Sequence, residues 1–263
     1  MMIPRYFEDL NILHENTMPA RAYYIPASRQ VDTFAGKRED SDRMQLLNGK
    51  WKFRYFKSIN ELNNDFFTQD YDISNENLIN VPSVWQMEGY DSHQYTNIRY
   101  PFPFDPPYVP QDNPCGTYVY LFDYHAEQKA PKAYLNFEGV DSCFYVWLNG
   151  MYVGYSQVSH ATSEFDVSGV IVEGVNKLAV LVLKWCDGSY LEDQDKFRMS
   201  GIFRDVYLLK RPEQAVRDYF VKTTVGTETK GRTAEVSIQL TYFEIVVPTK
   251  VYIYNAENAL EAE

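Results

Sequence analysis

One short stretch of the sequence gathers carboxylates, an amide, a hydroxyl and aromatic rings, and it covers residues 185–195. It reads Trp-Cys-Asp-Gly-Ser-Tyr-Leu-Glu-Asp-Gln-Asp. Carboxylate and amide groups bind sugar hydroxyls and hard cations, and Tyr and Trp faces pack against sugar rings. A solvated acidic turn is the plainer interpretation, but such a turn has no need of Trp185 and Tyr190. The stretch therefore predicts a carbohydrate or cation site.

The apolar segment just before this stretch must position it. Residues 178–183 read Leu-Ala-Val-Leu-Val-Leu, which predicts a fully buried strand over 176–184. A polar loop that leaves a rigid buried strand is a common way to hold a binding site.

Composition limits the possible partners and location. The chain has 263 residues, a formal net charge of -11 and 45% apolar residues, enough for one large or two ordinary domains. The acidic balance argues against nucleic acid, which needs a basic face, and no apolar run is long enough to span a membrane. Three widely spaced cysteines predict reduced thiols, and residues 1–5 show no apolar leader. We expect a cytoplasmic protein, or a periplasmic one if a leader was removed.

The central part of the chain predicts an all-β fold. Trp51, Phe53 and Tyr55 alternate with polar residues, as in a half-buried strand, and Asn149-Gly150 between two alternating runs predicts a tight hairpin. Helix is expected only as one short turn within residues 59–67. Further strands are predicted at 118–122, 133–138, 163–167 and 205–209. This spacing indicates an antiparallel jelly-roll sandwich over residues 46–212.

Two flanking segments complete the predicted organisation. Residues 1–45 contain Pro4, Pro19 and Pro26 and predict an irregular arm that wraps the domain or contacts a partner, with its charge run 38–43 solvated. Residues 213–263 hold three predicted strands, at 219–225, 234–240 and 250–254. They make about half of an immunoglobulin-like sandwich, so we expect a truncated second domain with an uncovered face. The proline-rich loop 101–114 is long enough to be functional.

Several motifs together resemble the sugar-binding domain of family 2 glycoside hydrolases, in its β-galactosidase branch. They lie at residues 48–53, 81–91, 95–101, 138–142, 147–150, 153–157, 163–166 and 193–206, in the order found in that family. The resemblance implies a galactose-binding-like jelly roll, then an immunoglobulin-like domain, then a (β/α)₈ barrel with two catalytic glutamates. Retaining hydrolysis uses two carboxyl groups about 5–5.5 Å apart. We therefore expect no catalytic residue in this chain and no hydrolysis by the chain alone.

The resemblance also implies two contributions to the galactoside site of an intact enzyme. Asn97 matches an asparagine that reaches the galactosyl unit, and Asp195 matches an aspartate that contacts the sugar and a sodium ion. Simpler interpretations stand beside these roles. Asn97 fits a turn residue ahead of a proline, and Asp195 fits a salt bridge to Arg198 or Arg204.

A peripheral magnesium site is implied in the same way. Gln157 and Asp187 match two of its ligands. The amino-terminal part departs from the pattern, because Asp9 stands where an asparagine is expected and Tyr6 where an aspartate is expected. A site that is empty or holds sodium is an equal alternative.

Three functions are compatible with these observations. The first is the sugar-binding part of a β-galactosidase, whose partners are a galactoside and the rest of the enzyme chain. The second is a free-standing carbohydrate-binding module. The third is a scaffold for assembly into a homo-oligomer, for which the long arm is suited.

Overall fold

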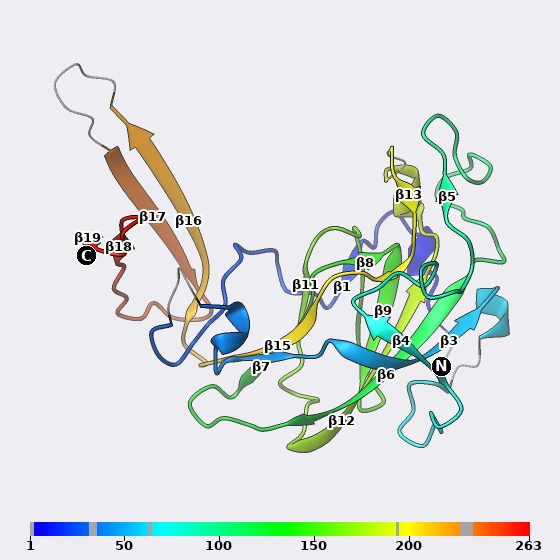
Figure 1. Ribbon diagram of the computed structural model, residues 1–263, viewed down its shortest axis with the longest axis horizontal. Helices are drawn as coiled ribbons and strands as arrows, with labels where there is room; N and C mark the ends of the chain where they lie inside the picture. Colours follow the sequence, from blue (N-terminus) through cyan, green and yellow to red (C-terminus); the bar gives the residue numbers. More distant parts are fainter. Residues whose placement is uncertain (1–2, 32–35, 63–64, 193–194, 227–233) are drawn as a thin grey trace.

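The computed structural model describes residues 3–31, 36–62, 65–192, 195–226 and 234–263, which form an all-β, antiparallel fold (Figure 1). The larger sheet has seven strands. In spatial order they are β1 (His14–Glu15), β10 (Met151–Gln157), β9 (Cys143–Leu148), β12 (Gly174–Leu183), β6 (Cys115–Tyr124), β3 (Gly49–Phe56) and β4 (Asn77–Val81). The smaller sheet has the order β11 (Ser163–Asp166), β7 (Lys132–Phe137), β15 (Val206–Arg211) and β2 (Met44–Leu46). The predicted all-β antiparallel sandwich is confirmed.

Strand β12 shows why its sequence is an unbroken apolar run. Leu178, Val180 and Val182 pack in the core between the sheets, while Ala179 and Leu181 face a second buried cluster. The amino-terminal segment and the Phe66–Phe67 pair belong to that cluster and cover the outer face of the sheet. Since successive side chains point to opposite faces, a strand covered on both sides must be apolar throughout.

The hairpin between β9 and β10 forms as predicted. Asn149 and Gly150 have φ values of 54° and 81°, the left-handed conformation that a type I′ turn needs. The Asn149 side chain also donates to Asn176 Oδ1 at 2.8 Å, which ties the turn to the start of β12.

The helical turn expected within residues 59–67 is shorter than predicted. The structure has a 3-10 helix η3 (Ile59–Glu61), where the Asn60 amide donates to the Ser58 hydroxyl at 3.2 Å. Residues 63 and 64 lie outside the described part of the chain. Three further 3-10 helices are η1 (Tyr6–Glu8), η2 (Arg38–Asp40) and η4 (Asp187–Tyr190). None of the described segments contains a helix long and apolar enough to cross a membrane.

The prediction that the charge run 38–43 is solvated is confirmed for Glu39, Asp40 and Asp42, which are exposed, but it was wrong for the two arginines. The arm folds back against the smaller sheet, where Arg38 pairs with Glu138 at 2.7 Å and also with Asp205. Arg43 is only 5% exposed and pairs with Glu127. The sequence could not show this, because each acidic partner lies far along the chain.

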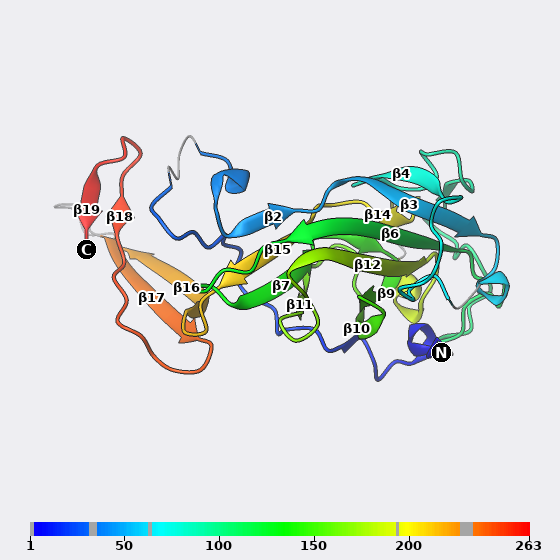
Figure 2. The same cartoon turned by 90° about the horizontal axis from the view of Figure 1, so that it is seen from below.

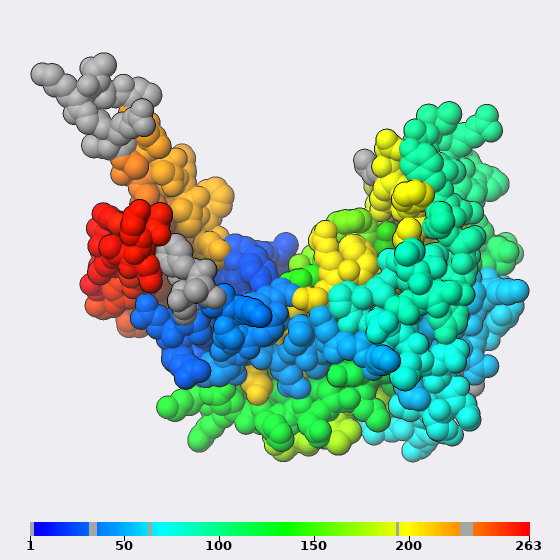
Figure 3. All heavy atoms as spheres, in the orientation of Figure 1, coloured from blue at the N-terminus to red at the C-terminus, as the bar shows by residue number. Residues whose placement is uncertain are grey.

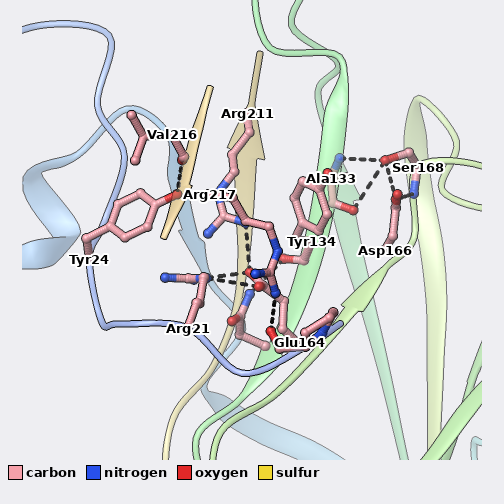
Figure 4. Close-up of polar contacts among 12 residues, drawn as sticks. Arg21, Tyr24, Ala133, Tyr134, Glu164, Asp166, Ser168, Arg211, Val216 and Arg217 are labelled. Carbon is pink, nitrogen blue, oxygen red and sulfur yellow. Dashed lines mark hydrogen bonds and ion pairs between the residues drawn. The ribbon is translucent and has the colours of Figure 1, made fainter. Parts of the chain in front are cut away.

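A second part of the arm is held by a buried ionic cluster (Figure 4). Arg21 Nε and Arg211 Nη1 lie 3.0 and 2.9 Å from the two carboxylate oxygens of Glu164. The Tyr24 hydroxyl donates to the Val216 carbonyl oxygen at 2.6 Å. The arm thus joins β11, β15 and the start of the next strand.

The carboxy-terminal segment projects from the sandwich as a hairpin. Strands β16 (Val216–Val225) and β17 (Ala234–Tyr242) pair with each other, and β18 (Ile253–Tyr254) pairs with β19 (Leu260–Ala262). The strand predicted over 250–254 is therefore shorter. Phe220, at 65% exposure, shows that one face of the hairpin is uncovered, as expected. Figure 2 places the two termini at opposite ends of the molecule, and the immunoglobulin-like identity of this segment stays a prediction.

Candidate functional site

The loop after β12 is held in place by its own aromatic residues. Trp185 and Tyr190 are both 7% exposed, so they anchor the loop instead of presenting open ring faces. The Trp185 ring meets Phe102 with centroids 5.1 Å apart, and the Tyr190 ring meets Phe102 at 5.2 Å and Phe104 at 5.5 Å. The expectation that Trp185 and Tyr190 offer ring faces to a sugar is corrected: they fasten the loop to the proline-rich segment.

The Tyr190 hydroxyl fixes the backbone of that proline-rich segment. It donates to the Tyr108 carbonyl oxygen at 2.6 Å, and the Pro103 carbonyl oxygen lies 3.2 Å away. It also accepts from the Asp105 amide at 3.2 Å. One hydroxyl therefore satisfies the Tyr108 carbonyl and the Asp105 amide of this loop, and it lies beside the Pro103 carbonyl. No local pattern in the sequence signals this role, because the three groups lie more than eighty positions away.

A small ribbon carries the two predicted substrate-binding residues. Strand β5 (Gln94–Tyr95) pairs with β13 (Phe197–Arg198), so that Tyr95 lies opposite Phe197. The Tyr95 hydroxyl donates to the Asp195 carboxylate, and this hydrogen bond raises the pKa of Tyr95. Asn97 follows Tyr95 by two residues and is exposed. The ribbon thus brings Asn97 and Asp195 to one region of the surface.

The simpler interpretations of these two residues fare differently. Asn97 lies in a bend between β5 and the proline-rich loop, as a turn residue would. The described residues show no ion pair between Arg204 and Asp195, and the Arg204 guanidinium donates to the His160 carbonyl oxygen at 3.2 Å. Glu192 accepts from the amide and hydroxyl of Ser159, both at 2.9 Å. Asp193 and Gln194 lie outside the described residues.

A partly buried carboxyl group near the ribbon was not singled out from the sequence. Asp141 ends β8 (Val140–Asp141), which pairs with β14 (Gly201–Ile202). Burial raises the pKa of Asp141 to about 7, although Lys196, whose Nζ lies 3.4 Å from the carboxylate, opposes the shift. This carboxyl group gains or loses its proton near neutral pH, beside the base of the ribbon.

The three residues predicted to hold magnesium lie at the junction of β10, η4 and the arm. Gln157 and Asp187 are 2% and 4% exposed. Within the described segments, the Gln157 side-chain atoms and Asp187 Oδ2 have no hydrogen-bond partner. Burial raises the pKa of Asp187, the Gly188 amide and the nearby Gln157 side chain oppose this shift, and the negative charge of Asp9 adds to it. One carboxylate oxygen and one amide oxygen, both buried and without a donor in the described residues, fit a hard cation such as Mg²⁺, and Asp9 lies within electrostatic range.

The rest of the expected magnesium pattern is weaker. The Tyr6 hydroxyl, at the position of an expected aspartate, donates to Glu15 Oε1 at 3.0 Å instead. Asp9 Oδ1 already accepts from both nitrogens of Asn11, at 3.0 Å. No three His, Cys, Asp or Glu side chains gather around a possible metal position in the parts of the chain that the structure covers. A cation here depends on the amide oxygen of Gln157 as well as on carboxylates.

Taken together, the fold and these loops define a β-sandwich domain with a polar, loop-borne site at one end, an architecture suited to carbohydrate binding. The family model of the sugar-binding domain of family 2 glycosyl hydrolases matches residues 44–212. The chain belongs to this family.

Named relatives agree with the family. The β-galactosidase of Actinobacillus pleuropneumoniae is 48% identical over 97% of this chain, and that of Staphylococcus xylosus is 46% identical over 91%. The chain spans 25% and 24% of the length of these two relatives. Among solved structures, a β-glucuronidase from an uncultured Clostridium species matches 92% of this chain and 39% of its own, with a TM-score of 0.61 and 19% identity. That likeness supports the fold.

Proposed function

We propose that this chain is the sugar-binding part of a β-galactosidase and that it helps to bind the galactosyl unit of the substrate. The observation that carries the proposal is the β5–β13 ribbon, which presents Asn97 and Asp195 on one exposed edge. Family membership and the two β-galactosidase relatives support the substrate class. The acid/base and nucleophile of retaining hydrolysis would come from residues outside this chain.

The two residues have complementary chemistry. The Asn97 amide can donate to one sugar hydroxyl and accept from another, and its side chain is exposed. The Asp195 carboxylate is oriented by the Tyr95 hydroxyl through one of its two oxygens. Its remaining lone pairs can accept from a sugar hydroxyl or coordinate Na⁺. Because both groups are solvated in this chain alone, they need further groups around the sugar to bind it tightly.

The shape of the molecule offers room for those further groups. Figure 3 shows a broad hollow between the projecting β16–β17 hairpin and the region of β5 and β13. In this proposal the rest of the enzyme chain occupies the hollow, covers the bare hairpin face and completes the galactoside site. Covering exposed apolar residues such as Phe220 would stabilise that assembly.

The experiment is hydrolysis of a chromogenic galactoside by the chain alone and after mixing with a separately expressed remainder of a matching enzyme. We expect activity only in the mixture. Asn97→Ala and Asp195→Asn should lower kcat/KM by about 10- to 100-fold, since each removes a polar contact of about 1.5–3 kcal/mol. Asn75→Ala and Asp112→Asn, at exposed positions elsewhere, are the matched controls. Turnover by the chain alone would contradict the proposal.

The cation site makes a separate part of the proposal. Asp187, Gln157 and Asp9 would hold Mg²⁺, whose role here would be to bind the arm against β10 and η4. Added Mg²⁺ should then raise the thermal midpoint of the chain, by mass action on the folded state. Asp187→Asn should abolish that increase, and the exposed substitution Asp112→Asn should leave it intact. A midpoint that does not respond to Mg²⁺ would show that these residues form a structural polar cluster only.

A further inference from the structure

A cavity of about 550 Å³ lies between η1 and the proline-rich loop, and neither Asn97 nor Asp195 lines it. We propose that it is a second carbohydrate site, which binds one neutral hexopyranose unit independently of the galactoside site. The residues that carry the argument are Arg5, Glu8, Phe102, Asp105, Tyr108 and Gln111. The volume lies within the range of roughly 300–1,000 Å³ typical of small-molecule sites.

The walls of this cavity are formed before any ligand arrives. Tyr190, outside the cavity, donates to the carbonyl oxygen of Tyr108 at 2.6 Å and accepts from the amide of Asp105 at 3.2 Å. The Phe102 ring is fixed against the largely buried Trp185. A site that is already ordered loses less conformational entropy on binding, which matters for a weak ligand such as a monosaccharide.

The rim of the cavity beside η1 is also held in place by hydrogen bonds. Glu8 Oε1 accepts from the Val109 amide at 3.1 Å, which ties η1 to the loop. Glu8 Oε2 accepts from Arg5 Nε at 3.0 Å and from Nη2 at 2.6 Å. The side chain of Glu8 is 8% exposed, so it serves as an anchor, whereas Arg5 is 56% exposed and has its Nη1 donors available.

The exposed groups suit a sugar better than a purely apolar ligand. Tyr108 is 60% exposed and offers a ring face for the C–H groups of a pyranose. The Asp105 carboxylate and the Gln111 amide are exposed, and their side chains have no hydrogen-bond partner in the described ranges. They can accept from and donate to sugar hydroxyls, and Arg5 adds a donor.

The charges also select against anionic sugars. Arg5 is neutralised by Glu8 through two hydrogen bonds to one carboxylate oxygen. Asp105 therefore leaves the cavity with a net negative charge. A uronate would meet a like charge there, while a neutral hexose would not. The geometry thus favours galactose or glucose over their uronic acids.

The test is titration of the 263-residue chain with galactose, glucose and galacturonate, followed by calorimetry or ligand-observed NMR. The chain contains a complete two-sheet core, so it can be used as it stands. We expect saturable millimolar binding of a neutral hexose and at least about tenfold weaker binding of galacturonate. Tyr108→Ala should weaken binding about tenfold by removing the ring face. The Tyr108 carbonyl that Tyr190 binds is kept, and an unchanged thermal midpoint would confirm that the variant folds.

Two matched variants distinguish this cavity from the galactoside site and from the bare hairpin face. Phe220→Ala removes an aromatic ring of similar exposure on β16, and Asn97→Ala alters the galactoside site, so neither should change the affinity. The proposal is overturned if none of the neutral sugars saturates the folded chain below roughly 50 mM. It is also overturned if Tyr108→Ala binds like the parent chain, or if galacturonate binds as tightly as galactose. Loss of binding in Asn97→Ala alone would overturn it as well, because the sugar would then occupy the galactoside site.

Discussion

Replacing Glu164 by Gln should destabilise the fold more than replacing its partner Arg21 by Met. Glu164 is 6% exposed and Arg211 is 1% exposed. Among the described residues, Arg211 Nε and Nη2 have no hydrogen-bond partner, and its guanidinium is otherwise surrounded by the rings of Tyr24, Tyr134 and Phe243. Without the Glu164 carboxylate, Arg211 becomes a buried cation supported only by aromatic faces.

The expected loss of stability in Glu164→Gln follows from the burial of Arg211. Removing one partner of a buried ion pair costs about 3–5 kcal/mol, mainly because the other charge is left uncompensated. For a domain of this size the thermal midpoint should fall by about 10 °C. Arg21→Met should cost only about 1–2 kcal/mol, since Glu164 keeps its 2.9 Å contact with Arg211. The diagnostic result is that Glu164→Gln loses more unfolding free energy than Arg21→Met.

The pH dependence gives a second readout. Burial by itself raises the pKa of Glu164, but Arg21 and Arg211 outweigh it and hold the pKa below its ordinary value. The ion cluster therefore contributes stability above the ordinary glutamate pKa, and this contribution is lost as the pH falls through the lower folded-state pKa. The difference in unfolding free energy between the parent chain and Glu164→Gln should shrink accordingly below about pH 4.5.

The assay is urea unfolding followed by tryptophan fluorescence at pH 7 and at several acidic values. Glu263→Gln, which removes an exposed partner of Lys250, is the matched control and should leave the midpoint unchanged. A Glu164→Gln midpoint equal to that of the control would refute the reasoning, because it would mean that the two guanidinium groups are hydrated or satisfied without Glu164.

Three further outcomes follow from single contacts. With its folded pKa raised to about 7, Asp141 contributes stability that is present below the unfolded value near 4 and lost as the pH rises to about 7. Asp141→Asn should flatten this loss, which amounts to about 3 kcal/mol between pH 5 and pH 8, in urea unfolding at those two pH values. Tyr190→Phe should cost about 1–3 kcal/mol and weaken saccharide binding at Tyr108, measured by unfolding and titration. Gly154→Ala would drive a Cβ into the Glu15 carbonyl oxygen, so hydrogen exchange at Glu15 should accelerate as β1 detaches.

The features that the sequence predicts correctly depend on residues that are neighbours in the chain. The β9–β10 turn depends on two adjacent residues, Asn149 and Gly150, whose backbone preferences dictate its shape. The buried strand around Leu181 is visible because its neighbours on both faces are apolar. Such features need no knowledge of distant contacts.

The features that could not be predicted depend on pairs far apart in the sequence. Arg38 meets Glu138 and Asp205 one hundred or more positions away, so an arginine that looks solvated in the sequence is in fact bound to the sandwich. The Tyr95–Asp195 contact also spans one hundred positions. Without the fold, Asp195 could be given a role only through the family resemblance.

The two proposed sugar sites differ in what they need from the rest of an enzyme. Asn97 and Asp195 sit on a ribbon that is exposed on its free side, and two polar groups competing with water bind a hexose weakly. The cavity beside Tyr108 has aromatic, cationic and anionic groups on fixed walls, all within this chain. Covering the ribbon should therefore increase its affinity strongly, whereas the cavity should bind equally well in the chain alone and in an assembled enzyme, provided that the same assembly leaves its mouth open.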